Sequence, residues 1–323
     1  MKRTKERTGG TTCLRLLMIA LALIAPSLLF ADTSDTPDLI ILHTNDIHGR
    51  IEVAEGLLGM PTIKTLVEDY RARYGNVLVL DAGDTLHGRP IANQLQGRSV
   101  VETMNAAGYD VMVPGNHDFN FGYPHLLELE NLMEFDLVAA NVYKENERLF
   151  RPWVIRRVGD YRVGIFGLAT PDTYQTTHPR NIEGLVFDDM VDAAHTAVAE
   201  LREEEVDLVV ALGHVGFGRN YPSTDIVKEV SGIDLFVDGH SHDLLLHGEV
   251  HHDTLFVQAN EYSKYLGKVE IRFREEGLQM KASVITPSDA AARGLEPDSE
   301  IQEMIVALRD EIRQRMLGTW EGD

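Results

Sequence analysis

Short apolar runs alternate with amphipathic stretches along most of the chain. The runs that predict strands lie at 39–42, 77–80, 111–113, 137–140, 162–167, 208–212, 235–237, 254–258 and 267–273. Helical periodicity covers 60–74, 100–107 and 188–205. Continuous apolar strands that alternate with helices are typical of a layered α/β domain in which the strands are buried.

The pattern changes after residue 285. A link rich in Pro, Gly and Ala precedes residues 299–316, which predict a charged amphipathic helix. Its apolar stripe consists of Ile301, Met304, Ile305, Leu308 and Ile312. Such a stripe has to pack on something, either the α/β domain or a domain that the sequence does not include.

The first 31 residues have the order of an export signal. Basic side chains precede an apolar stretch, 16–30, which ends at the small residue Ala31. The stretch is shorter than the roughly 20 apolar residues of a spanning helix, although an uncleaved membrane anchor is the alternative. The single cysteine, Cys13, lies within this segment, so the mature chain would have no disulfide. We expect an exported protein, periplasmic or extracellular at the cell surface.

Composition and charge exclude some classes of function. The chain is 44% hydrophobic and 25% charged, as in ordinary globular proteins, and its formal net charge is −21. This charge argues against binding to a nucleic-acid backbone. It would also repel a phosphate substrate, unless cations bound in the site supply positive charge.

Polar side chains follow five of the predicted strands. In α/β sheets, ligands bind beyond the carboxyl ends of the strands, so these groups are expected to converge. The side chains in question are Asp46, His48, Asp84, Asn116, His117, Asp118, His214, His240 and His242.

Each of these motifs taken alone can be explained as a turn. In VPGNHDFNFG, residues 113–122, turn chemistry accounts for Gly115, Asn116 and Asp118 but leaves His117 unexplained. Five such clusters in order, each directly after an apolar strand, are not expected from turns alone. The set predicts a metal site.

The ordered set resembles the calcineurin-like metallophosphoesterases, and more closely the catalytic domain of the secreted bacterial 5′-nucleotidase and UDP-sugar hydrolase family. The stretches that carry the resemblance are LHTNDIHGR, DAGDTLHG, PGNHDFNFG, ALGHVG, DGHSH and EYSKYLGKVEI. It covers residues 38–285, the expected catalytic domain. It implies a four-layer α/β/β/α sandwich with two central sheets.

The resemblance also implies the roles of the site residues. Asp46, His48 and His242 would hold one metal, Asp84 would bridge to a second, and the second would be held by Asn116, His214 and His240. Carboxylate, amide and imidazole donors without thiolate suit Mn²⁺, Zn²⁺, Co²⁺ or iron. His117 would stabilise the transition state.

The chemistry of phosphate esters requires such a site. Hydrolysis of phosphate monoesters demands acceleration of up to about 10²¹-fold, and one general acid supplies only about 10²–10⁴-fold. Two metal ions can clamp both reacting oxygens and generate a metal-bound hydroxide, which attacks the phosphorus.

The family pattern has an acid three residues after the catalytic histidine, and here that position is Asn120. Asp118 is the only acid in the motif. We therefore expect Asp118 to partner His117 if the turn allows, whereas Asn120 could only orient the ring.

The sequence does not identify the substrate. Family members that hydrolyse nucleotides carry a C-terminal domain that grips the base, and residues 286–323 offer only a linker and a helix. The chain is expected to be single-domain, split from a separately encoded nucleotide-binding domain, or truncated. We predict a phosphohydrolase of small phosphoesters, with nucleotides as 5′-nucleotidase substrates. The alternatives are 2′,3′-cyclic-nucleotide phosphodiesterase and 3′-nucleotidase activity, another ester specificity including thiosulfate esters, or a non-catalytic metal- or ligand-binding protein.

Overall fold

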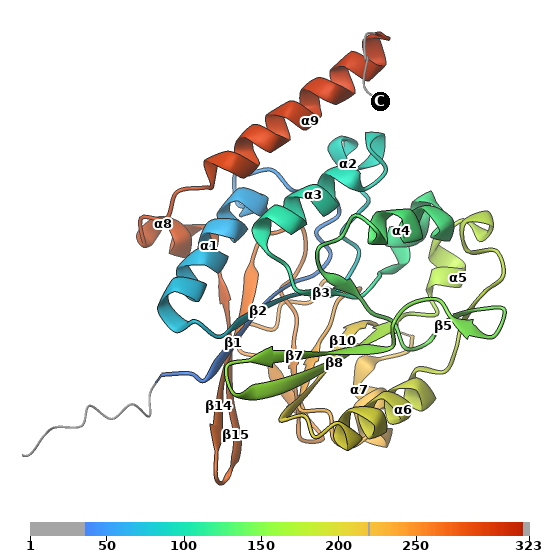
Figure 1. Ribbon diagram of the computed structural model, residues 1–323, viewed down its shortest axis with the longest axis vertical. Coiled ribbons are helices and arrows are strands. Elements are labelled where there is room, and N and C mark those ends of the chain that lie inside the picture. The colour runs from blue at the N-terminus through green and yellow to red at the C-terminus, as the bar shows by residue number, and fades with distance from the viewer. Residues whose placement is uncertain (1–35, 219, 319–323) are drawn as a thin grey trace, which may run out of the picture. The chain divides into compact units, whose positions relative to one another are not determined.

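The computed structural model describes residues 36–218 and 220–318, so the signal predicted at 1–31 lies outside the described residues. The described part contains two six-stranded sheets (Figure 1). The first has the strand order β15 (Gly277–Ile285), β14 (Leu266–Arg274), β1 (Leu39–Thr44), β2 (Val77–Asp81), β3 (Val111–Met112) and β4 (Asp136–Leu137). β1 to β4 are parallel, and β14 and β15 are antiparallel to their neighbours.

The second sheet has the order β12 (Glu249–His251), β13 (Thr254–Val257), β11 (Leu235–Val237), β10 (Leu208–His214), β8 (Tyr161–Ala169) and β7 (Trp153–Val158). Its four inner strands are parallel. A small antiparallel sheet is formed by β6 (Glu147–Arg148), β5 (Val142–Lys144) and β9 (Leu185–Phe187).

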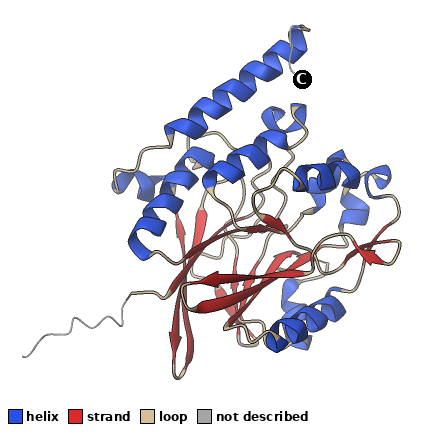
Figure 2. Ribbon diagram, viewed as in Figure 1, coloured by secondary structure: helices blue, strands red, loops and turns tan. Residues whose placement is uncertain are grey.

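Helices connect the strands (Figure 2). The α-helices are α1 (Gly59–Tyr74), α2 (Pro90–Gln94), α3 (Arg98–Ala107), α4 (Tyr123–Glu130), α5 (Thr173–Thr176), α6 (Met190–Glu203), α7 (Ser223–Glu229), α8 (Pro287–Ala292) and α9 (Ser299–Leu317). The described residues also include the 3₁₀ helices η2 (Asn116–Phe121) and η3 (Pro179–Ile182). None of the helices within the described ranges is both long and apolar enough to cross a membrane.

Strand alternation builds three hydrophobic layers. On β1, Leu39 and Ile41 face the second sheet, while Ile40 and Leu42 face the helices on the other side. The layer between the sheets consists of strand residues from both, and α6 and α7 cover the outer face of the second sheet. The predicted four-layer α/β/β/α sandwich with two central sheets is therefore confirmed.

The expected strand at 137–140 is wrong beyond Leu137. The backbone N–H groups of Ala139 and Ala140 donate to Arg151 and Gly167 of the second-sheet region instead of continuing the first sheet. This apolar run crosses between the sheets, where it is fully buried, so its hydrophobicity reflects burial rather than strand pairing.

The C-terminal helix packs on the domain. Ile301, Ile305 and Leu308 of α9 are buried in the same hydrophobic layer as α1 and α3. Arg98 of α3 also pairs with Glu311 of α9. Of the two expectations for the apolar stripe, packing on the α/β domain is the one the structure shows.

Candidate metal centre

The side chains predicted from the strand ends converge in two triads. Asp46, His48 and His242 form one, and Asp84, His214 and His240 form the other. Within each triad the ligand atoms lie within 4.8 Å of one another. Asn116 joins the second triad, because its Oδ1 lies 3.1 Å from Nε2 of His214.

The backbone at these residues adopts an unusual conformation. Positive φ angles occur at Asp46 (51°), His48 (49°), Asp84 (57°), His240 (72°) and His242 (58°). Non-glycine residues in this region cost roughly 1–3 kcal/mol each and cluster at functional sites. The fold thus holds five of the seven predicted ligands in a conformation that local preferences disfavour.

Asp84, a member of the second triad, also faces the first. Its Oδ2 is 3.3 Å from Nε2 of His214 in one triad and 3.8 Å from Nε2 of His48 in the other. Its Oδ1 accepts a hydrogen bond of 2.7 Å from the backbone N–H of His117. One oxygen is therefore anchored, and the other faces both groups of ligands, which is the position a shared ligand requires.

Three of the histidines are oriented by acceptors behind them. Nδ1 of His214 donates to the carbonyl of Ala82 at 2.7 Å, so its Nε2 faces Asp84. Nδ1 of His242 lies 2.6 Å from Glu261, and Nε2 of His240 lies 3.2 Å from Asp172. Such outer acceptors fix which ring nitrogen is free to bind a metal.

Charge in the centre is concentrated and buried. Burial opposes ionisation of Asp84, but the neighbouring imidazoles of His214 and His48 outweigh it and lower the pKa of that carboxyl below its usual range. Burial alone would lower the pKa of the His214 imidazole, yet the Asp84 carboxylate raises it to about 10. For His240, burial and the charge of His214 lower the pKa to about 4.

These residues fit a pair of divalent cations. Each triad combines at least one carboxylate with two imidazoles, and it contains no thiolate. Five of these six side chains are no more than 12% exposed, and His242 is 32% exposed. A buried cluster of acids and histidines is stabilised when a cation neutralises the acids and accepts the imidazole lone pairs.

His117 lies beside the first triad. Its ring centroid is 5.4 Å from that of His48, and its Nδ1 is 2.8 Å from Nδ2 of Asn120. The same Asn120 nitrogen lies 3.3 Å from Nδ1 of His87, whose ring stacks on His117 at 5.9 Å. The sequence alone suggests an ordinary loop residue at His87, and the structure brings it to the centre.

The predicted pairing of Asp118 with His117 is wrong. Asp118 accepts hydrogen bonds from the backbone N–H groups of Asp84, Thr85, Leu86 and Gly115, at 2.8–3.0 Å. Residues 116–121 form the 3₁₀ helix η2, in which side chains three apart lie on the same side. The side chain of Asn120 therefore contacts the His117 ring. Asp118 points away from that ring and binds the backbone of the loop that carries Asp84.

Comparison with known proteins agrees with this geometry. Residues 39–244 match the family model described as calcineurin-like phosphoesterase. The chain belongs to this family. It is 30% identical to protein UshA of Escherichia coli over 302 residues, which cover 81% of this chain and 55% of that protein. It is 32% identical to the human 5′-nucleotidase over 276 residues, covering 74% of this chain and 47% of the other.

A solved structure supports the fold assignment. The 5′-nucleotidase precursor from Thermus thermophilus superposes with a TM-score of 0.73 at 30% identity, covering 86% of this chain and 59% of that one. The resemblance to the catalytic domain of the 5′-nucleotidase family is thus confirmed. The chain spans about half the length of UshA and of the human enzyme.

Sequence reasoning missed the supporting residues. Asp172, Glu261 and His87 lie on loops after strands, at positions where no motif of alternating ligands draws attention to them. Asp172 does follow β8 directly, in Ala-Thr-Pro-Asp, so the rule applied to the other strand ends would have found it. Glu261 and His87 do not directly follow a strand, although they lie within EYSKYLGKVEI and DAGDTLHG, two of the stretches that carry the family resemblance.

Proposed function

We propose that the chain is an exported metal-dependent phosphohydrolase that releases phosphate from nucleotides, in the manner of a 5′-nucleotidase. The observation that carries the proposal is the position of the Asp84 Oδ2 between one histidine of each triad. The expectation of export rests on the sequence pattern of residues 1–31.

The ligands divide into two groups around Asp84. Asp46, His48 and His242 would hold one divalent ion, and Asn116, His214 and His240 would hold the other. Mn²⁺, Zn²⁺, Co²⁺ and iron all suit these donors. When bound, such a pair would supply Lewis-acid charge to the phosphoryl oxygens and lower the pKa of a water towards about 7.

His117 is the residue proposed to act on the phosphoryl group. The Asn120 amide nitrogen donates to its Nδ1, which places the ring proton on Nε2. A donor held there, beside the first triad, can bond the oxygen on which negative charge builds in the transition state. Asn120 thus orients the ring without charging it.

Phosphate release by the manganese-loaded full chain tests the proposal. AMP and 4-nitrophenyl phosphate should both be hydrolysed, and His117→Asn should lower kcat by about 10²–10³-fold, as for loss of one oxyanion donor. Glu229→Gln, an exposed change at the end of α7, is the control and should leave kcat unchanged.

Two diesters separate the rival activities. Hydrolysis of one ester bond releases no phosphate, so formation of adenosine monophosphate from 2′,3′-cyclic AMP and of 4-nitrophenol from bis(4-nitrophenyl) phosphate are the signals to follow. Faster turnover of these diesters than of the monoesters would favour a phosphodiesterase. If a protein with bound Mn²⁺ hydrolysed none of these esters, the proposal would be wrong and a metal-binding protein would be the better description.

A further inference from the structure

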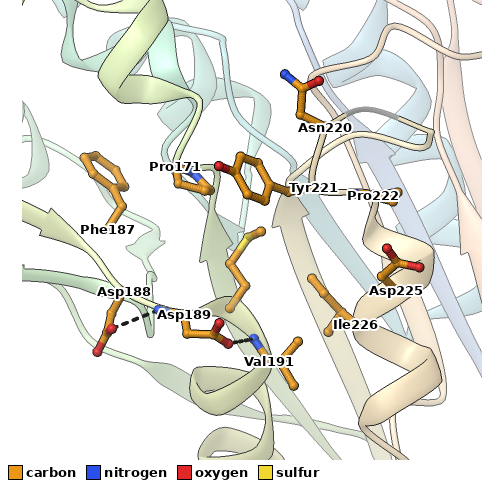
Figure 3. Close-up of a pocket in the computed structure, with 11 residues that line it drawn as sticks. Pro171, Phe187, Asp188, Asp189, Val191, Asn220, Tyr221, Pro222, Asp225 and Ile226 are labelled. Carbon is orange, nitrogen blue, oxygen red and sulfur yellow. Dashed lines mark hydrogen bonds between the residues drawn. The ribbon is translucent and has the colours of Figure 1, made fainter.

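A cavity of about 370 Å³ lies between the segments that leave β8 and β10 (Figure 3). One side is formed by residues that follow β8, among them Pro171, Phe187 and Met190. The other side is formed by Tyr221 and Ile226, which follow β10. β8 and β10 are adjacent parallel strands, so the cavity lies in the crevice beyond their carboxyl ends, where α/β sheets bind ligands.

The cavity and the metal centre both lie where β8 and β10 end. His214, the last residue of β10, is in register with Ala169, the last residue of β8. Pro171 in the cavity wall directly precedes Asp172, whose carboxylate lies 3.2 Å from His240. Pro171 in the wall is thus adjacent in the sequence to a residue that contacts a candidate ligand of the second metal.

The lining has an apolar side and a polar side. Phe187 and Met190 are buried, at 7% exposed each, while Tyr221 is 48% exposed. The side chains of Asn220, Tyr221 and Asp225 make no hydrogen bond with any other described residue. Figure 3 shows Asn220 and Tyr221 on the loop before α7 and Asp225 in the first turn of that helix.

The other two acids of the cavity already have partners. Asp189 accepts from the N–H groups of Val191 and Asp192 as the cap of α6. Asp188 accepts from the N–H of Asp189. These carboxylates stabilise the turn into the helix, so the groups left for a ligand are the Tyr221 ring and hydroxyl, the Asn220 amide and the Asp225 carboxylate.

We propose that this cavity binds the leaving group of the phosphoester, and that the group is an alcohol with a flat, largely apolar body that carries hydroxyl or amine donors, as a nucleoside does. The proposal rests on the proposed function and deepens it. The body would stack on Tyr221 against the apolar wall, and the donors would bond Asp225 and Asn220. The volume lies at the lower end of the about 300–1,000 Å³ of small-molecule sites.

Kinetics on two esters test the assignment in the manganese-loaded full chain. AMP would occupy the cavity, whereas ethyl phosphate is too small to reach across it. Tyr221→Ala should raise KM for AMP about tenfold, as expected for loss of one base–aromatic stack, with kcat little changed. Tyr221→Phe should stay within about twofold, and all variants should hydrolyse ethyl phosphate like the unmodified chain.

A change that removes one negative charge at nearly constant size tests the polar side of the cavity. Asp225→Asn should also raise KM for AMP, about three- to tenfold, whereas Glu229→Gln in the same helix but outside the cavity should not. If Tyr221→Ala and Asp225→Asn leave the preference for AMP over ethyl phosphate unaltered, the cavity is not the leaving-group site, although hydrolysis itself would stand.

Binding of adenosine to the metal-free chain separates this proposal from the proposed function. Calorimetry should detect adenosine binding that Tyr221→Ala weakens about tenfold, whether or not any ester is hydrolysed. Failure to hydrolyse both esters would overturn the proposed function alone. Absence of adenosine binding, or binding that Tyr221→Ala does not change, would overturn the assignment of the cavity.

Discussion

Asp172 lies outside the predicted ligand set and yet contacts it. It is 7% exposed, and its Oδ2 lies 3.2 Å from Nε2 of His240, which leaves Nδ1 of that ring for a metal. The other oxygen, Oδ1, has no hydrogen-bond partner among the described residues. A buried carboxylate in this position serves to hold an imidazole in one orientation.

Asp172→Ala should weaken metal binding at the second triad about 10–100-fold, because the ring of His240 loses the acceptor that orients it. Calorimetric titration with Mn²⁺ measures the affinity of each site. The matched control is Glu203→Ala, an exposed change at the end of α6. Equal affinities in all three proteins would show that Asp172 does not orient the ligand.

His43 is a buried histidine that the metal centre does not use. It is 2% exposed on β1, its Nδ1 has no partner among the described residues, and a Cβ at Gly267 would overlap its ring. Burial lowers the pKa of its imidazole to about 3. Within the fold it is therefore neutral over the physiological pH range.

This histidine should make the domain acid-sensitive. The unfolded chain protonates His43 near pH 6.5 and the folded chain only near pH 3, so the unfolded state binds more protons between these values and stability falls as pH drops through that window. The loss amounts to about 2 kcal/mol between pH 7 and pH 5.

Urea unfolding of the chelator-treated chain at the two pH values measures this loss. His43→Leu should reduce the difference in unfolding free energy by about 2 kcal/mol. An unchanged difference in the variant would show that folding does not lower the pKa of His43.

At the level of elements, the sequence predicts the buried parts and misses the exposed or short ones. The strands at the centre of both sheets are continuous apolar runs, and helices α1, α3, α6 and α9 have a clear apolar face. The apolar pattern does not predict β15, because its outer half is alternately exposed and half-buried at the edge of the first sheet, with polar residues such as Gln279 and Lys281. β15 forms because it pairs with β14, and this pairing cannot be predicted from the residues of β15 alone.

In the candidate site, too, some features can be predicted from local sequence and others depend on the folded structure. The convergence of the candidate ligands could be predicted because each lies at the end of an apolar strand in a short motif. The partner of His117 could not, because it depends on whether residues 116–121 form an open turn or a 3₁₀ helix. In the helix the side chain three positions on, Asn120, meets the ring.

Packing of α9 on the domain can be measured. Leu308 is 4% exposed between α9 and the helices beneath it, and Val306 on the same helix is 58% exposed. Leu308→Ala should lower the free energy of unfolding by about 2–5 kcal/mol, whereas Val306→Ala should change it by less than about 0.5 kcal/mol. Equal, small effects in urea titrations would indicate that α9 does not pack on the domain in solution.

For the molecule as a whole, net charge and function are linked through the metal centre. A chain with a net charge of −21 would repel a phosphate ester. The predicted ligands form two clusters, and each contains one carboxylate and two histidines. Two divalent cations there would reverse the local charge where the substrate has to bind. The centre therefore explains how an acidic protein can act on an anion.

The central claim is that two ions, shared through Asp84, enable the chain to hydrolyse a phosphomonoester. The most direct test is a titration of the chelator-treated chain with Mn²⁺, recording bound metal and the release of phosphate from 4-nitrophenyl phosphate on the same samples. We predict that activity is absent without metal and rises as two ions bind per chain. Asp84→Asn should abolish at least one of the two sites and lower kcat at least about 10³-fold. Full activity with a single bound ion, or activity that survives Asp84→Asn, would contradict the claim.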